Sequence, residues 1–221
     1  VFASAVSIPL MRLSGLAAGI ATFGVLEIAN NVLRYYDKIG PGLNAFSSVP
    51  ETTGIWQAAI GALICVVVAF AYQRSRFGRQ LRATREDPAA ASAAGISIYR
   101  QRLLAFAVSG ALAGLAGGLY VHLLPVEIDS LYLDLTFLTL AMLVVGGSGS
   151  LLGAVVGALA IGGLDSFLSA AENGVDLFGW QLNLPTDTAA LAVGVLMALV
   201  LIARPSGLTG GRELSLGWVR R

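Results

Sequence analysis

The chain has 221 residues, of which 56% are hydrophobic and 12% charged, and its formal net charge is +1. A water-soluble domain carries about 25% charged residues, so this composition excludes an ordinary soluble protein and indicates one that lies mostly in lipid. The charge balance also excludes a nucleic-acid-binding protein. The single cysteine, Cys65, can form neither an intrachain disulfide nor a two-cysteine metal site.

Several apolar stretches approach the length that a membrane-spanning helix needs, about 20 residues. They predict an all-α, multi-pass membrane domain over residues 1–203. The predicted spans lie near residues 13–33, 55–72, 103–121, 136–145, 151–171 and 188–203. The fourth stretch is too short to span alone, and a glycine-rich segment, Gly146-Gly147-Ser148-Gly149, separates it from the fifth. This pair is predicted to be either a discontinuous, re-entrant helix pair around Gly146–Gly149 or two full crossings.

The basic residues predict the orientation of these spans. Residues 73–102 and the tail 204–221 hold eleven of the fourteen lysine and arginine residues. Since basic residues favour the cytoplasmic side of a membrane, we expect this loop and this tail to be cytoplasmic. Residues 121–135 and 171–187 carry acidic side chains but no lysine or arginine, which fits the opposite side.

The loop 73–102 contains the signals of two short helices. Asp87 suits an N-cap, Pro88 the first helical position and Gly95 the position just after a helix end. Between them, five of the six residues from Ala89 to Ala94 are alanine. A helix with such a smooth surface is typical of one that seats in a groove on a partner.

Two features are candidates for a translocation path. Glu27 is a carboxylate within a predicted span, where it faces either an aqueous cavity or the membrane interface. The glycines Gly146, Gly147 and Gly149 break a helix at membrane depth, which is tolerated where the backbone is buried or lines a cavity. A tight turn between two helices is an equal alternative for them. Glycines at four-residue spacing predict close helix packing in two spans, at Gly110, Gly114 and Gly118 and at Gly149, Gly153 and Gly157.

The chain lacks the residues for chemistry of its own. Its only lysine, Lys38, is followed by Ile39, so no phosphate-binding loop is present. One histidine, His122, and scattered carboxylates do not make a hydrolase site. We therefore predict no enzyme, no cofactor and no metal site. A secondary transporter driven by an ion gradient stays an alternative, although only Glu27 and Asp165 offer carboxylates for it within the spans.

Five segments together resemble one known family. In chain order they are RLSGLAAGIATFGVLEI, SRFGRQLRATREDPAAASAAGI, LLAFAVSGALAGLAGGLY, LAMLVVGGSGSLLGAVVGA and RPSGLTG, and they cover most of the chain. They resemble the branched-chain amino acid ABC transporter permeases, and the first and last look more like the M-type inner-membrane permease subunit than its H-type companion. In this family, the loop that matches residues 73–102 docks on the ATPase. The resemblance thus implies an ATPase-coupling role for Arg82, Arg85, Glu86, Asp87, Pro88, Ala89, Ala90, Ala91 and Gly95.

The resemblance also implies a function and partners. It implies an importer that translocates branched-chain or other amino acids across the cytoplasmic membrane, with urea or short amides as an alternative substrate class. The implied partners are a second homologous permease subunit, two cytoplasmic ATPase subunits, an extracytoplasmic substrate-binding protein and membrane lipid. Members of this family usually carry further spans before the first segment, where this chain has only residues 1–11. We therefore expect either a missing upstream segment or a start at a non-standard codon.

Overall fold

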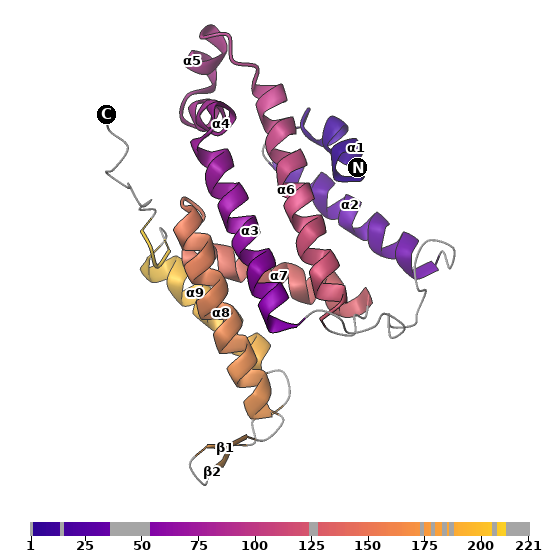
Figure 1. The fold of residues 1–221 in the computed structure, drawn as a ribbon, viewed down its shortest axis with the longest axis vertical. Coiled ribbons are helices and arrows are strands. Elements are labelled where there is room, and N and C mark those ends of the chain that lie inside the picture. Colours follow the sequence, from indigo (N-terminus) through magenta and orange to yellow (C-terminus); the bar gives the residue numbers. More distant parts are fainter. Residues whose placement is uncertain are drawn as a thin grey trace. The chain divides into compact units, whose positions relative to one another are not determined.

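The computed structural model describes residues 2–13, 16–35, 54–123, 128–172, 175–177, 180–182, 185, 188–204 and 207–210. In this part of the chain nearly all regular structure is helical, which confirms the predicted all-α class (Figure 1). The helices are α1 (Phe2–Leu10), α2 (Leu16–Tyr35), α3 (Ile55–Arg74), α4 (Arg76–Glu86), α5 (Pro88–Ala93), α6 (Ile98–Val121), α7 (Ile128–Gly146), α8 (Leu151–Glu172) and α9 (Thr188–Ala203). The chain divides into two compact units, Val1–Tyr132 and Leu133–Arg221.

Four helices among the described residues are long and apolar enough to cross a membrane: α2, α3, α6 and α8. Helix α9 and the part of α7 from Tyr132 to Gly146 are apolar but shorter. Helix α7 begins at Ile128, well before the predicted stretch 136–145, and Asp134 lies inside it. An apolar run shows only which residues suit lipid. The helix itself can extend beyond the run into polar residues, as α7 does here. Several apolar helices in one chain are what a membrane-embedded protein requires.

In the first unit, α3 and α6 lie side by side, and α4 and α5 lie at one end of this pair (Figure 1). Gly61 lies at the contact of α3 with α6, where a methyl group would meet the flexible end of the Leu119 side chain and displace it. Helix α1 packs on the other side of α6, again at a glycine, because a methyl group at Gly110 would collide with Ala3. The hydroxyl of Tyr99 in α6 donates to the carbonyl oxygen of Ile8 over 3.3 Å. Glycines therefore lie at the contacts of α6 with α1 and with α3.

In the second unit, α7, α8 and α9 share a small apolar core of Ala141, Val145, Ile161 and Val193. The backbones of α7 and α8 come close together at glycines, because a methyl group at Gly157 would collide with the carbonyl oxygen of Met142. This confirms the predicted close packing at Gly153 and Gly157, whereas no described atom packs closely against Gly114 or Gly118 on α6. Glu172, the last residue of α8, accepts a hydrogen bond from the backbone N–H of Ala189 over 2.7 Å. It thereby satisfies one of the open donors at the start of α9.

A short antiparallel hairpin follows α8 and is an addition to the predicted helices. It consists of β1 (Val175–Leu177) and β2 (Trp180–Leu182), with Val175 opposite Leu182. This hairpin lies within residues 171–187, the acidic connection that the sequence assigns to the side of the membrane opposite the arginine-rich loop. With three residues in each strand, it makes only a small contribution to the fold.

Candidate functional site

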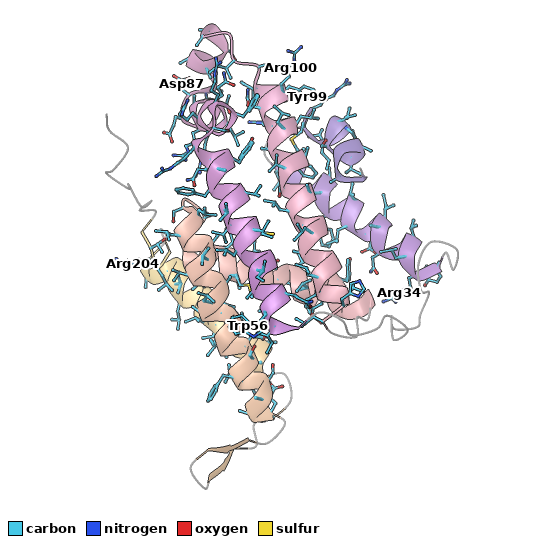
Figure 2. All side chains as sticks on the ribbon, viewed as in Figure 1. Arg34, Trp56, Asp87, Tyr99, Arg100 and Arg204 are labelled. Carbon is cyan, nitrogen blue, oxygen red and sulfur yellow. The ribbon has the colours of Figure 1, made fainter. Side chains whose placement is uncertain are left out.

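The first candidate site is the pair of short helices α4 and α5, which joins α3 to α6. Ser75 ends α3 and begins α4, and its Oγ accepts a hydrogen bond from the N–H of Gly78 over 3.2 Å. Asp87 begins α5, and its Oδ1 accepts from the N–H groups of Ala89 and Ala90 over 2.9 and 3.0 Å. Figure 2 shows Asp87 between the two short helices, near the start of α6. The sequence prediction of a capped helix starting at Pro88 is confirmed.

Helix α5 ends in a left-handed glycine turn. Gly95 has a φ of +79°, a conformation that residues with a side chain adopt only with strain. The N–H of Ile96 donates to the carbonyl oxygen of Ala91 and that of Gly95 donates to Ser92, both over 3.0 Å. These two bonds form a Schellman motif, which closes the helix and turns the chain toward α6. The placement of Gly95 just after the helix end is as the sequence predicted.

The predicted coupling residues divide into an exposed set and a single buried one. Ala91 is only 5% exposed and packs toward the rest of the first unit. The exposed residues among those predicted are Arg82, Arg85, Glu86, Asp87, Pro88, Ala89, Ala90 and Gly95. On α4, Gly78 and Thr84 face inward instead. The pair of helices thus presents an arginine-rich surface on α4 and a surface of methyl groups on α5.

A side-chain amide pair joins α4 to α6, and no sequence pattern predicted it. Gln101, which is 7% exposed, donates from Nε2 to Oε1 of Gln80 over 2.7 Å. Oε1 of Gln101 is buried and has no hydrogen-bond partner among the residues that the structure describes. Glutamine has no preferred place in a periodic pattern of apolar residues, so only the tertiary contact reveals the pair. It ties the candidate coupling helices to a candidate membrane span.

The second candidate site contains Glu27, whose carboxylate accepts two hydrogen bonds. Nδ2 of Asn31, one helical turn along α2, donates to Oε1 over 2.9 Å. The hydroxyl of Tyr132, near the start of α7, donates to Oε2. From the sequence, Tyr132 fits an aromatic residue of the membrane interface, and nothing in the pattern connects it with Glu27. The structure brings these residues together although 105 positions separate them.

The glycine-rich segment after α7 is a tightly packed turn that also contacts the C-terminal part of the second unit. Gly146 and Gly147 are buried, whereas Gly149 is exposed. The N–H of Leu208 donates to the carbonyl oxygen of Val145 over 2.8 Å, and Oγ1 of Thr209 donates to that of Gly146 over 2.9 Å. These bonds satisfy backbone acceptors that the end of α7 leaves open.

The same turn also starts α8. Oγ of Ser150 accepts from the N–H of Gly153 over 3.0 Å and lies 3.3 Å from Oγ1 of Thr209. Gly207, with a φ of +72°, passes so close to Gly147 that a methyl group there would collide with its backbone. The motif RPSGLTG was part of the family resemblance, and the described residues 207–210 now have a structural role within it. They stabilise the turn between α7 and α8 through their hydrogen bonds to Val145 and Gly146.

The described residues contain no group of three or more His, Cys, Asp or Glu side chains that could hold a metal ion. His122 lies exposed at the end of α6. Cys65 lies within α3, a candidate membrane span, and is a free thiol. The described residues of interest are therefore the exposed pair of short helices, the glycine turn after α7 and the hydrogen-bonded carboxylate of Glu27.

Comparison with known proteins agrees with this arrangement. The LivM permease protein of Methanocaldococcus jannaschii, named a probable branched-chain amino acid transport permease, is 30% identical over 210 residues, covering 91% of this chain and 58% of its own length. The LivH protein of the same organism is 33% identical, covering 62% of this chain and 42% of its own length. LivM of Escherichia coli K12, a high-affinity system permease, is 27% identical, with 90% and 52% covered.

The chain thus spans about half the length of the curated relatives it matches. No solved structure matches it. A family model described as the permease component of branched-chain amino acid transport systems matches residues 5–203, nearly the whole chain. The chain therefore belongs to the family of branched-chain amino acid transport system permease components.

Proposed function

We propose that this chain is a permease subunit of an ATP-driven importer that translocates amino acids across the cytoplasmic membrane. The observation that carries the proposal is the pair α4–α5, a short, doubly capped element with an exposed alanine surface between two candidate membrane spans. Such a surface suits a groove on a cytoplasmic ATPase, because methyl groups fit closely without requiring charged partners. The M-type assignment is supported by the longer coverage of the chain by LivM than by LivH relatives.

The working complex contains a second homologous permease, two ATPase subunits and an extracytoplasmic binding protein. Residues 73–102 and 204–221 lie on the cytoplasmic side in this proposal, and residues 121–135 and 171–187 on the opposite side. ATP-driven closure of the ATPase pair displaces α4 and α5, and their contacts with α3 and α6 carry the movement into the membrane. Glu27 and the turn at Gly146, Gly147 and Gly149 are the candidates along the translocation path.

Branched-chain amino acids are the substrates that the names of the relatives give, and we propose amino acids for this chain as well. Urea and short amides are the alternative. Uptake of leucine and of urea by the reconstituted complex, measured at equal protein concentration, distinguishes amino acids from urea and short amides as substrates. The carboxylate of Glu27, described below, favours a substrate with a positively charged group.

The coupling role is tested at Ala90, because this residue is exposed and leaves the packing of α5 unchanged. In proteoliposomes with all partners, we expect Ala90→Glu to reduce ATP-dependent leucine uptake at least tenfold, since a charged side chain cannot enter an apolar groove without loss of hydration. Membrane insertion should be unchanged. Ala91→Glu is unsuitable, because Ala91 is buried and its replacement would also disturb the fold.

The matched control is His122→Glu. It introduces a glutamate at another exposed position, at the end of α6 away from the short helices. It should leave uptake near the wild-type rate. Unchanged uptake in Ala90→Glu would contradict the proposed docking surface. Uptake that persists without the ATPase subunits and follows an ion gradient would instead identify a secondary transporter.

A further inference from the structure

Glu27 is held in place by two hydrogen-bond donors that carry no charge. One donor is the side-chain amide of Asn31 on the same helix, and the other is the hydroxyl of Tyr132 near the start of α7. Each donor occupies a different oxygen of the carboxylate. The carboxylate is therefore fixed in orientation from two directions, while neither donor compensates its negative charge.

Among the residues that the structure describes, no positively charged side chain pairs with this carboxylate, which lies on a helix long and apolar enough to span a membrane. A carboxylate in the middle of a membrane helix is costly to insert, and such groups face a partner or an aqueous pathway. A positively charged group beside Glu27 would offset this cost. The carboxylate also keeps acceptor capacity for such a group, because each of its oxygens can accept about two hydrogen bonds and has one from these donors.

We propose that Glu27 binds the ammonium group of an α-amino acid during its passage, with Tyr132 and Asn31 as the residues that position the carboxylate. This inference rests on the proposed transport function and narrows its substrate class. An ammonium group has three N–H donors and a full positive charge. It can therefore donate to the remaining acceptor positions of Glu27 and neutralise its negative charge. Urea and short amides bring donors but no charge, and the site discriminates against them.

The position of the site fits a step early in import. In the proposed topology, the chain leaves α2 and enters α7 on the extracytoplasmic side. Glu27 lies in the second half of α2, and Tyr132 lies in the first half of α7. A substrate released by the binding protein would therefore meet this carboxylate soon after it enters the membrane.

The test is equilibrium binding of radiolabelled leucine to the complete complex in nanodiscs, measured without the binding protein. We expect Glu27→Gln to weaken leucine binding about tenfold or more, as loss of a charged hydrogen bond usually does. Tyr132→Phe should weaken binding less, because it removes only a positioning bond. In the wild-type complex, 2-hydroxy-4-methylpentanoate, which has a hydroxyl in place of the ammonium group, should not displace leucine.

Asp165→Asn is the matched control, because Asp165 is another carboxylate on a candidate span, α8. It should bind leucine as the wild type does. Wild-type affinity in Glu27→Gln, or full displacement of leucine by the hydroxy acid, would overturn the proposal. Loss of the partner permease from the Glu27→Gln complex would also overturn it, since Glu27 would then belong to the subunit interface.

These results also separate this inference from the proposed function. ATP-dependent leucine uptake by the wild type, with leucine binding unchanged in Glu27→Gln, rejects the ammonium site and keeps the amino acid importer. Uptake of urea but of no amino acid by the wild type rejects the proposed substrate class itself.

Discussion

At the scale of single residues, Asp87 has two tasks at the boundary between the short helices. Its N–H donates to the carbonyl oxygen of Ala83 at the end of α4, and its carboxylate caps the start of α5. One residue thus fixes both the end of one helix and the beginning of the next. Without the side chain, the N–H groups of Ala89 and Ala90 would depend on water.

We therefore expect Asp87→Ala to destabilise α5 by about 1 kcal/mol, the usual cost of losing an N-cap. Hydrogen exchange at the amides of Ala89 and Ala90 should become about five times faster, which corresponds to that free energy. Asp87→Asn keeps an oxygen acceptor and should exchange nearly as slowly as the wild type. Equal exchange in Asp87→Ala and the wild type would show that the cap does not stabilise the helix.

At the scale of elements, the amide pair Gln80–Gln101 governs how α4 is attached to α6. The two residues are unequal, because Gln101 is buried with one unpaired acceptor, whereas Gln80 is partly exposed. An unpaired buried polar group costs about 1–3 kcal/mol, and a typical intramolecular hydrogen bond contributes about 1 kcal/mol. Removing one partner or the other should therefore have different consequences.

Gln80→Leu should destabilise the α4–α6 contact by about 1–3 kcal/mol, because it leaves the whole amide of Gln101 buried without a partner. Gln101→Leu removes the bond but also the unpaired acceptor, so its effect should be close to zero. The double variant should resemble Gln101→Leu. Thermal unfolding of the three variants in one detergent measures these differences, and a larger loss in Gln101→Leu than in Gln80→Leu would contradict this account.

At the scale of the whole molecule, the described residues leave much of the apolar surface of the candidate spans uncovered within their own units. Helices α2 and α6 have no buried residues in their most apolar windows, and α3 has few. Lipid and further protein are the natural covers for such surface. The proposed topology follows from the arginine distribution, and it determines which side the coupling helices face.

Single cysteines can test this topology in spheroplasts, in a background with Cys65 replaced by serine. A membrane-impermeant maleimide should label His122→Cys from outside, because this residue is exposed at the end of α6. Ser92→Cys, exposed on α5, should be labelled only after the membrane is opened. The reverse pattern would show that the arginine-rich loop is extracytoplasmic and would rule out its docking on a cytoplasmic ATPase.

The sequence alone determined the features that depend on local order along the chain. Composition indicated a membrane protein, apolar runs predicted most helices, and Asp87, Pro88 and Gly95 predicted the short capped helix, since caps and turns depend on neighbouring residues. Only the tertiary structure revealed the bonds from Tyr132 to Glu27, from Gln101 to Gln80 and from Thr209 to Gly146. These contacts join residues far apart in the chain, and helical periodicity carries no information about which helix faces which.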